Sequence, residues 1–357
     1  MRGSIRAVLC AAAGVGTFAT GPLVGRTAAV EVPASVEVAA PVEVAAAVAV
    51  PAAVGVPKAD SVAVDYARAS VAATDTSALR RALERATQGY RGVVGISVRN
   101  LATGEVLSIR GHEKFPSASL IKVPILVTLM DEVNAGRMQL DERVSILARD
   151  RVGGSGVLKH MGSGLAPTLE DLAWLMIVLS DNTATNLLLD RLDIATVWQK
   201  MEALGLPQSK VHSKTFRRQT SIAPDSSVKY GFGVAVPDEI TQLFALLHEG
   251  RAVSPALDSL SLDILRANQD GTMLVRWLPS SVRVAHKSGQ VNEARNDCGI
   301  MYTPAAPIAI CVMTRENVDT SYAVDAEPHL LVARVAREVF RHYNPQVELP
   351  PLPQIRN

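Results

Sequence analysis

FPSASLIKVPILVTLMDEVNA, residues 115–135, is the most informative segment of this chain. From Ser119 onward its apolar residues have helical spacing, and the pattern stops before Gly136. Pro124 falls in the early turns, where a helix tolerates proline. So apolar a helix is buried in a domain core. We therefore expect a buried helix over 119–135 that begins with a serine and carries Lys122 in its first turn.

Ser119 and Lys122 stand three residues apart, so on a helix they share one face. A lysine amine can take the proton of a serine hydroxyl only when the amine is uncharged, and burial or a neighbouring cation favours that state. The same S-x-x-K spacing recurs at Ser226 and Lys229, in a segment that we expect to be a loop. Because the spacing alone is weak, it is the helix context that favours Ser119 as a nucleophile.

The segments on either side predict the fold class. Alternating apolar residues and capping signals mark strands and helices, including a capping box that begins at Thr168. Helices are expected at 77–86, 168–179, 183–191, 194–204, 238–249 and 328–342, and strands at 92–99, 105–110, 282–288, 297–303 and 307–314. Strands, then a block of helices, then strands and a last helix indicate an α+β fold with a helical insertion.

Two polar tripeptides follow the S-x-x-K segment at wide spacing. SDN, at 180–182, lies in the turn between two expected helices, and KSG, at 287–289, ends an expected strand. Taken singly, each is explained as a helix cap or as a strand entering a turn. Together with S-x-x-K they supply what a serine needs to attack an amide: a base, a proton donor for the leaving nitrogen and a cation for a substrate carboxylate.

With these three motifs the chain resembles the penicillin-recognising serine hydrolases, and class A β-lactamases in particular. The longer stretches that carry the resemblance are FPSASLIKVPIL at 115–126, LMIVLSDNTATNLLLDRL at 175–192 and VAHKSGQ at 284–290. The resemblance covers about residues 65–345. It implies a β-lactamase/transpeptidase-like fold, in which an antiparallel sheet is flanked by helices and an all-helical subdomain is inserted at about 118–250.

The resemblance also implies a role for each motif residue. Ser119 would be acylated, with Lys122 as its base and Ser180 as the proton donor to the leaving nitrogen. The residues implied to hold the substrate are Asn182, Lys287, Ser288, Gly289 and Gln290. The backbone N–H groups of Ser119 and Gln290 would form the oxyanion hole. This chemistry calls for no metal or cofactor, and the seven histidines have no zinc-binding spacing.

One part of the class A pattern is missing. Class A β-lactamases carry an E-x-x-L-N motif, whose glutamate activates the water that hydrolyses the acyl-enzyme. Residues 203–237 contain no glutamate, and their only acid is Asp225, although Asn186, which supports that glutamate in the family pattern, is present. Because general-base help is worth roughly 100-fold to 10,000-fold, we expect slow deacylation unless Asp225 substitutes.

Three functions are compatible with these residues. The first is a class A β-lactamase-like hydrolase that acts on β-lactams, and the second is a cell-wall D,D-peptidase, esterase or acyl-transferase with a different acyl acceptor. The third is a sensor module that stays acylated. The expected partner is a small β-lactam or peptidoglycan-like substrate, and we expect a monomer. With 36 Lys plus Arg against 35 Asp plus Glu, the chain has no global field to attract nucleic acid.

The first 64 residues are expected to lie outside the folded domain. Arg2 and Arg6 precede an apolar stretch and small residues up to Ala29, which is the order of a secretory signal peptide. Residues 30–64 are rich in alanine, valine and proline and are typical of a disordered spacer. We expect a periplasmic or secreted protein, attached to a membrane only if the N-terminal segment stays uncleaved, and a C-terminal tail at 346–357.

Two of the three cysteines are expected to face each other across a hairpin. If the hairpin is symmetric about Pro304 and Ala305, Cys298 is opposite Cys311. Directly opposed Cβ atoms lie about 4.5–5.5 Å apart, close to the disulfide distance. An oxidising compartment would permit the bond. A one-residue change of register would instead leave two free buried cysteines.

Overall fold

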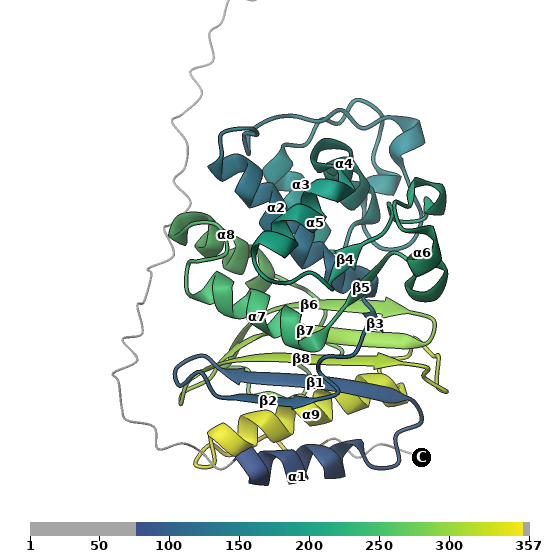
Figure 1. The fold of residues 1–357 in the computed structure, drawn as a ribbon. Coiled ribbons are helices and arrows are strands. Elements are labelled where there is room, and N and C mark those ends of the chain that lie inside the picture. Colours follow the sequence, from purple (N-terminus) through teal and green to yellow (C-terminus); the bar gives the residue numbers. More distant parts are fainter. Residues whose placement is uncertain (1–75, 353–357) are drawn as a thin grey trace, which may run out of the picture. The chain divides into compact units, whose positions relative to one another are not determined.

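The computed structural model describes residues 76–352 of the chain, all within one compact unit. Its centre is an antiparallel sheet in the order β2-β1-β8-β7-β6 (Figure 1). The strands of this sheet are β1 (Val93–Asn100), β2 (Val106–Ile109), β6 (Arg283–Val291), β7 (Ala294–Tyr302) and β8 (Pro307–Arg315). The expected signal peptide and spacer at 1–64 lie outside the described residues.

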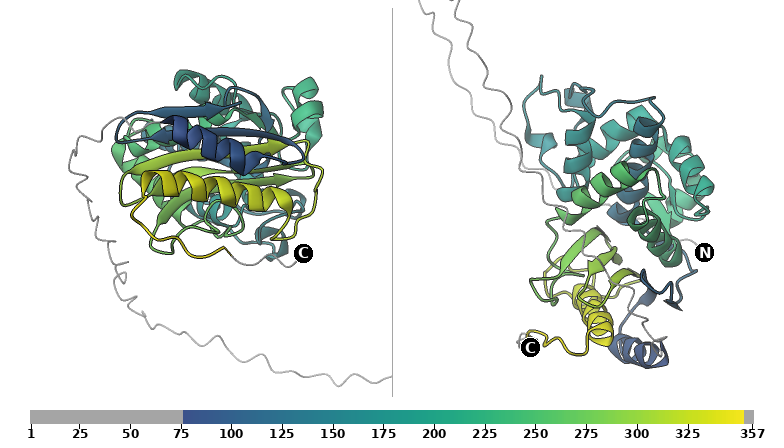
Figure 2. Two further views of the ribbon diagram at one scale, coloured as in Figure 1. Left: turned by 90° about the horizontal axis from the view of Figure 1, so that it is seen from below. Right: turned by 90° about the vertical axis from the view of Figure 1, so that its left-hand side faces the viewer.

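Both faces of the sheet are buried, because helices pack on each of them. Alternate residues of each strand point to opposite sides and so belong to different clusters. On one face, Ile96 and Ile310 share an apolar cluster with α1 (Thr76–Thr87) and α9 (Glu327–Tyr343). Figure 2 shows these two helices side by side beneath the sheet. Cys311 and Met313, on the other face, belong to a cluster that includes α7 (Pro237–His248) and α8 (Pro255–Arg266). The α+β prediction is confirmed.

The remaining helices form the upper part of the molecule in Figure 1. They are α2 (Lys122–Asn134), α3 (Leu169–Val178), α4 (Asn182–Leu192), α5 (Ile194–Ala203) and α6 (Pro224–Tyr230). The capping box of α3 is present, with Asp171 N donating to Thr168 Oγ1 at 3.0 Å and Thr168 N donating to Asp171 Oδ2 at 2.8 Å. Among the described helices, none has the length and apolarity to cross a bilayer.

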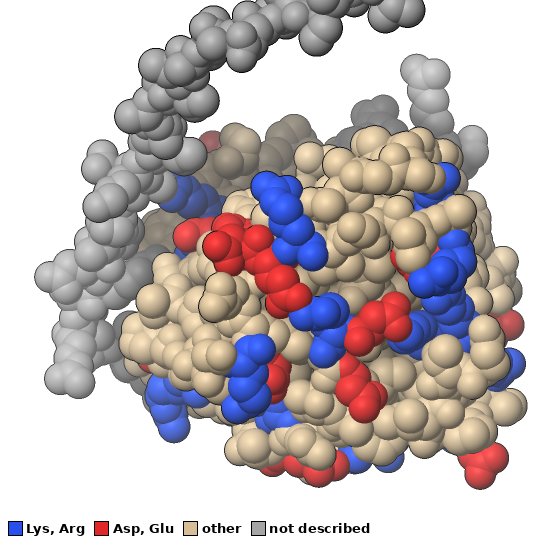
Figure 3. Space-filling view, turned by 90° about the horizontal axis from the view of Figure 1, so that it is seen from above, with Lys and Arg blue, Asp and Glu red and all other residues tan. Residues whose placement is uncertain are grey.

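The surface of this upper part carries charges of both signs. Figure 3 shows basic and acidic side chains interspersed over it. The ion pair of Lys200 with Asp131 links α5 to α2, and Arg191 on α4 pairs with Glu142. These pairs are partly exposed, so each contributes little to stability.

The structure corrects three local expectations. Residues 226–229 are not in a loop but in the short helix α6, where only Ser227 is buried, so no apolar periodicity revealed it. The segment 255–266, for which the sequence analysis predicts no element, forms α8 behind Pro255. KSG does not end its strand, since β6 continues through Gly289 to Val291.

The structure also contains a small second sheet that the sequence analysis does not predict. Its strand order is β3-β5-β4, with β3 (Phe115–Pro116), β4 (Lys210–Val211) and β5 (Gly233–Ala235).

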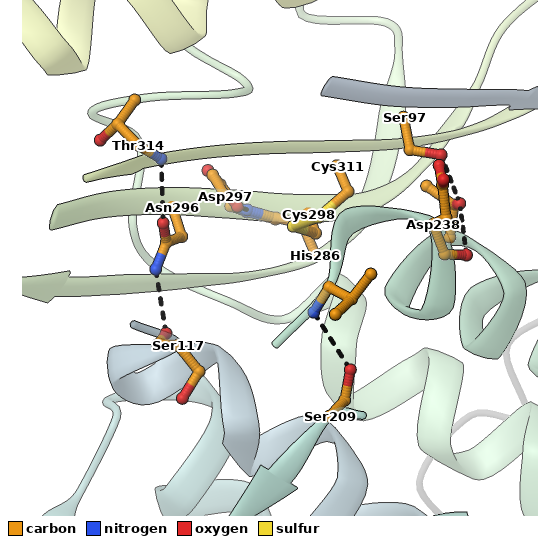
Figure 4. The surroundings of a disulfide bond; sticks show 12 residues. Ser97, Ser117, Ser209, Asp238, His286, Asn296, Asp297, Cys298, Cys311 and Thr314 are labelled. Atoms are coloured by element: carbon orange, nitrogen blue, oxygen red, sulfur yellow. Dashed lines mark hydrogen bonds and ion pairs between the residues drawn. A yellow bond between two sulfur atoms is a disulfide. The ribbon is translucent and has the colours of Figure 1, made fainter. Parts of the chain in front are cut away.

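Strands β7 and β8 form the symmetric hairpin predicted from the sequence. Cys298 is opposite Cys311 and Ile300 is opposite Ala309. A disulfide joins the two cysteines (Figure 4), so the structure has the bond rather than two free thiols. The next residue in this row across the sheet is Lys287 on β6. The disulfide therefore links β8 to β7, the strand that pairs with β6 at Lys287.

Candidate active site

Ser119 lies in a 3₁₀ turn, η1 (Ala118–Ile121), that leads into α2, and not in the α-helix itself. Ala118 has a φ of 47°, a conformation that residues with a side chain seldom adopt. Asn296 on β7 fixes this turn, because its Nδ2 donates to Pro116 O at 2.8 Å and to Ser117 O at 3.1 Å (Figure 4). The turn that carries Ser119 is thus attached to the sheet.

Strand β6 passes η1 at close range. A Cβ atom on Gly289 would lie 2.5 Å from Ser117 O, 2.8 Å from Leu120 N and 3.1 Å from Ser119 N. No side chain fits in that space, so glycine is required by the close approach of two backbones. This close contact places the backbone after Gly289 beside Ser119. The glycine within strand β6 is thus explained by the contact with η1 and not by a turn.

The backbone of Gln290 faces the free edge of the sheet. Arg295, directly opposite on β7, donates from its backbone N to Thr314 Oγ1 at 2.9 Å and accepts from the same hydroxyl at 2.8 Å. Its polar backbone groups therefore point toward β8, and those of its partner Gln290 point away from β7. His286 O, which has the same orientation, accepts from Asn268 Nδ2 at 3.0 Å outside the sheet. Because β6 is the edge strand, the Gln290 N–H is available to a ligand.

Lys122 is completely buried and is bound by uncharged groups. Its Nζ donates to Ser180 O at 2.8 Å, to Ser180 Oγ at 3.1 Å and to Asn182 Oδ1 at 2.9 Å. Burial and the positive charge of Lys287 hold the pKa of Lys122 well below its usual value, although Asp181 opposes them. The amine is therefore favoured in the uncharged form that a base requires. No described hydrogen bond joins it to Ser119.

The turn at Ser180 is held by the loop at 153–158. Asp181 caps α4 by accepting from Ala184 N at 3.0 Å, and its other oxygen accepts from Val157 N at 2.6 Å and Leu158 N at 2.9 Å. Asn182 Nδ2 donates to the carbonyl oxygen of residue 153 at 3.1 Å. A buried, fully bonded Asp181 thus fixes the orientation of the residues on both sides of it.

A cavity of about 380 Å³ brings the predicted site residues together. It is lined by Ser119, Ser155, Val178, Leu179, Ser180, Asn268, Gln269, Asp270, Lys287, Ser288, Gln290 and Tyr322. Lys122 and Asn182 lie directly behind Ser180, to which Lys122 is bonded. Lys229 of the second S-x-x-K lines a different cavity, of about 550 Å³. In the described part of the chain, no cluster of His, Cys, Asp or Glu could hold a metal ion.

Lys287 is the only cation in the wall of this cavity, among the residues that the structure describes. Its side chain is buried, and Nζ donates to Ser288 O at 2.8 Å. Burial lowers the pKa of Lys287 to about 8, while the carboxylates of Asp270 and Asp297 oppose this shift. Around neutral pH the lysine therefore carries a positive charge beside the cavity.

The family model described as the β-lactamase enzyme family matches residues 78–343. The chain belongs to this family. The β-lactamase of Streptomyces cellulosae is 31% identical over 244 residues, which are 66% of this chain and 75% of the relative. The ROB-1 β-lactamase of Haemophilus influenzae is 26% identical over 73% of this chain and 83% of its own.

Solved structures agree with this assignment of a β-lactamase family fold. The β-lactamase of Sphaerobacter thermophilus has a TM-score of 0.66 at 29% identity and covers 76% of this chain and 98% of its own. PBP-A has a TM-score of 0.67 at 25% identity, with coverage of 76% and 97%, and a mutant of it is an acyl-enzyme complex with penicillin G. The chain is thus a β-lactamase-like hydrolase with class A-like relatives.

Asn186 binds the loop backbone in this β-lactamase family member. Its Nδ2 donates to Thr215 O at 3.0 Å, and its Oδ1 accepts from Thr215 N at 2.8 Å. Asp225, the one acid between residues 203 and 237, is exposed on α6 and does not line the cavity of Ser119. The substitution of Asp225 for the missing glutamate therefore gains no support from its position.

Two lining residues were not found from the sequence. Asp270 follows α8 and belongs to none of the three motifs, and Tyr322 lies in the loop before α9. The ring of Tyr322 has the Arg295 guanidinium 4.2 Å from its centre, and Arg295 also donates to Thr320 O and Ser321 O at 2.9 and 2.7 Å. No motif or periodicity in the sequence marks either residue, because contacts with segments distant in the sequence place each of them in the cavity wall.

Proposed function

We propose that this chain is an exported serine hydrolase that forms an acyl-enzyme with β-lactams through Ser119. The observation that carries the proposal is the buried Lys122 amine, which has only uncharged hydrogen-bond acceptors and is bonded to Ser180 in the wall of the Ser119 cavity. An amine in this setting serves as a base at neutral pH. The family membership supports the same chemistry.

In the acylation step, Ser119 Oγ attacks the carbonyl carbon of the lactam and its proton passes to Lys122. The carbonyl oxygen becomes an oxyanion, which the N–H groups of Ser119 and Gln290 stabilise. The free-edge orientation of Gln290 and the close passage of β6 along η1 support this pairing of donors.

The carbon–nitrogen bond then breaks, and the leaving nitrogen needs a proton. Ser180 donates it and recovers one from Lys122, 3.1 Å away. Asn182 binds the amide side chain of the substrate, and Lys287 and Ser288 hold the carboxylate of a penicillin. Water completes the cycle by hydrolysing the ester at Ser119.

Deacylation is proposed to be slow, because the 203–237 segment supplies no carboxylate to the cavity. A second function, as a cell-wall D,D-peptidase, esterase or acyl-transferase, is favoured by this same feature and by the similarity to PBP-A. Such an enzyme passes the acyl group to an acceptor that provides its own nucleophile. Its natural substrate would be peptidoglycan-like.

The site assignment is tested by covalent labelling with a fluorescent penicillin. Ser119→Ala is expected to abolish labelling, whereas the matched control Ser226→Ala, which changes the second S-x-x-K on α6, leaves it intact. Labelling that survives in the first variant and disappears in the second contradicts the assignment.

The rate of deacylation is tested by intact-mass measurement during turnover of a chromogenic β-lactam. We expect an adduct of penicillin mass that persists after the free drug is removed. Rapid turnover with no trapped adduct would show that another group acts as the base, and loss of that turnover in Asp225→Asn would identify it. An adduct that never decays, with any acceptor, is the outcome expected of a sensor.

Export is proposed from the signal-like segment up to Ala29, and the Cys298–Cys311 disulfide supports it because such bonds persist in oxidising compartments. We propose a monomer that acts in the periplasm or outside the cell. A mature N-terminus near residue 30, read from the protein recovered outside the cytoplasm, is the expected result.

A further inference from the structure

Asp270 places a carboxylate beside the groups that are proposed to bind the carboxylate of a penicillin. Its Oδ2 accepts from Ser288 Oγ at 2.6 Å and from Gln290 Nε2 at 3.2 Å. Its Oδ1 accepts from Thr272 Oγ1 at 2.6 Å and Thr272 N at 3.0 Å. The hydroxyl of Ser288 is therefore already engaged by an acid of the protein itself.

Asp270 also balances the charge of the cavity. Among the described residues that line it, Asp270 is the only acid and Lys287 the only cation. Burial works to raise the pKa of Asp270, but the hydrogen bonds from Ser288 and Thr272 and the charge of Lys287 outweigh it and lower the pKa. At neutral pH the carboxyl is thus an anion, and the lining carries no net charge.

A second carboxylate in this place meets a like charge at close range. The repulsion between two anions a few ångströms apart is large in a partly buried cavity, since the effective dielectric constant there is far below that of water. An uncharged substrate group at this position leaves the charges of Asp270 and Lys287 balanced. A cationic substrate group would instead add one positive charge that nothing in the lining neutralises.

We propose that Asp270 is a specificity-determining residue that occupies the carboxylate-binding position at Ser288 and selects acyl donors that are uncharged there. The preferred substrate class is then neutral amides and esters, and penicillins that carry a free carboxylate are acylated at a disadvantage. This inference rests on the proposed acylation of Ser119.

The test compares penicillin G with its methyl ester, which lacks the negative charge and is larger by one methyl group. We expect the unaltered protein to be acylated by the ester at least as fast as by the acid, measured as second-order rate constants by intact mass. In Asp270→Asn, which keeps an acceptor for Ser288 and removes the charge, the rate for the acid relative to the ester rises roughly tenfold or more.

Asp263→Asn is the matched control, because it removes an exposed carboxylate from α8 that does not line the cavity, and the ratio is expected to stay unchanged. An unchanged ratio in Asp270→Asn, with both probes still reacting, overturns this inference and leaves the proposed function standing. Failure of both probes to label the unaltered protein overturns both.

If Asp270→Asn does not fold, the two acylation rates of the unaltered protein still test the role of Asp270. A penicillin G rate more than about tenfold above that of its ester would show that Lys287 and Ser288 still receive a substrate carboxylate despite Asp270.

Discussion

At the scale of single residues, the two buried lysines of the site do different work. Lys122 is bonded to neutral oxygens and its pKa falls well below the usual lysine value, whereas Lys287 lies near the acids Asp270 and Asp297 and its pKa falls only to about 8. The uncharged amine is suited to accept a proton and the charged one to attract an anion. The difference arises from the groups around each lysine and not from the residue type.

Acylation by a penicillin that carries a carboxylate is expected to have a bell-shaped pH profile. As pH falls through the lowered pKa of Lys122, the amine is protonated and can no longer act as a base. As pH rises through about 8, Lys287 loses the charge that attracts the carboxylate. Labelling rates from pH 5 to pH 10 measure both limbs, with buffer blanks to correct for hydrolysis of the drug.

Lys287→Arg provides the control for the alkaline limb, because arginine stays charged over this whole range. We expect the limb near pH 8 to disappear in this variant while the acidic limb remains. An alkaline limb that is the same in both proteins would contradict the assignment of that limb to Lys287.

At the scale of elements, the site depends on the contact between strand β6 and the turn η1. Gly289→Ala would bring a methyl group to 2.5 Å from Ser117 O, so the strand or the turn must shift and the two proposed oxyanion donors separate. We expect penicillin labelling to fall by at least roughly tenfold, and by roughly 100-fold to 1,000-fold if one oxyanion donor is lost completely. A thermal melt checks that the variant still folds.

Gly162→Ala is the matched control, because a Cβ at that position meets no atom within 4 Å. Its labelling rate is expected to equal that of the unaltered protein. Equal rates in both alanine variants would show that the β6–η1 contact does not position the donors.

The β7–β8 hairpin carries a prediction about covalent state and stability. The full chain, denatured without reduction, is expected to show one free thiol, from Cys10, and three after reduction. The disulfide closes a loop of sequence separation 13, so replacing both of its cysteines by alanine is expected to lower the free energy of unfolding by about 2–4 kcal/mol. Urea titration measures this, and three free thiols before reduction would contradict the bond.

At the scale of the whole molecule, the site lies between two parts of one compact unit. Ser119 and Ser180 come from the helical part, and Lys287 and Gln290 from the edge of the sheet. The lining residues span positions 119–322, so every one of them belongs to the described unit. The groups named in the proposed chemistry therefore all come from the described residues.

A chain that begins at residue 65 is accordingly expected to be labelled by penicillin at the rate of the full chain. A chain that begins at residue 92 lacks α1, whose Leu79 and Leu83 are fully buried against the sheet and α9. Loss of a single buried leucine side chain costs about 2–5 kcal/mol. We therefore expect this second chain to be unfolded by circular dichroism, and a folded, reactive product would contradict the importance of α1.

Sequence patterns were enough to predict the fold class and most helices and strands, and they identified the motif residues and one register that would place Cys298 opposite Cys311. These features depend on neighbours along the chain: helical and strand periodicity are local, and in an antiparallel hairpin one turn position sets every opposed pair, so Cys298 and Cys311 could be matched by arithmetic. The motifs were informative because three short patterns occurred in one order on the expected elements.

The groups that surround those motifs are set by packing between segments that are distant in the sequence. The bond from Ser288 to Asp270 spans 18 residues and those from Asn296 to the turn before Ser119 span about 180, and no sequence period connects such pairs. The 3₁₀ turn at Ser119, the strand that continues past Gly289 and the free edge at Gln290 likewise result from packing between segments. Burial, charge balance and close backbone contact are properties of the folded chain, because they depend on which distant residues meet in space.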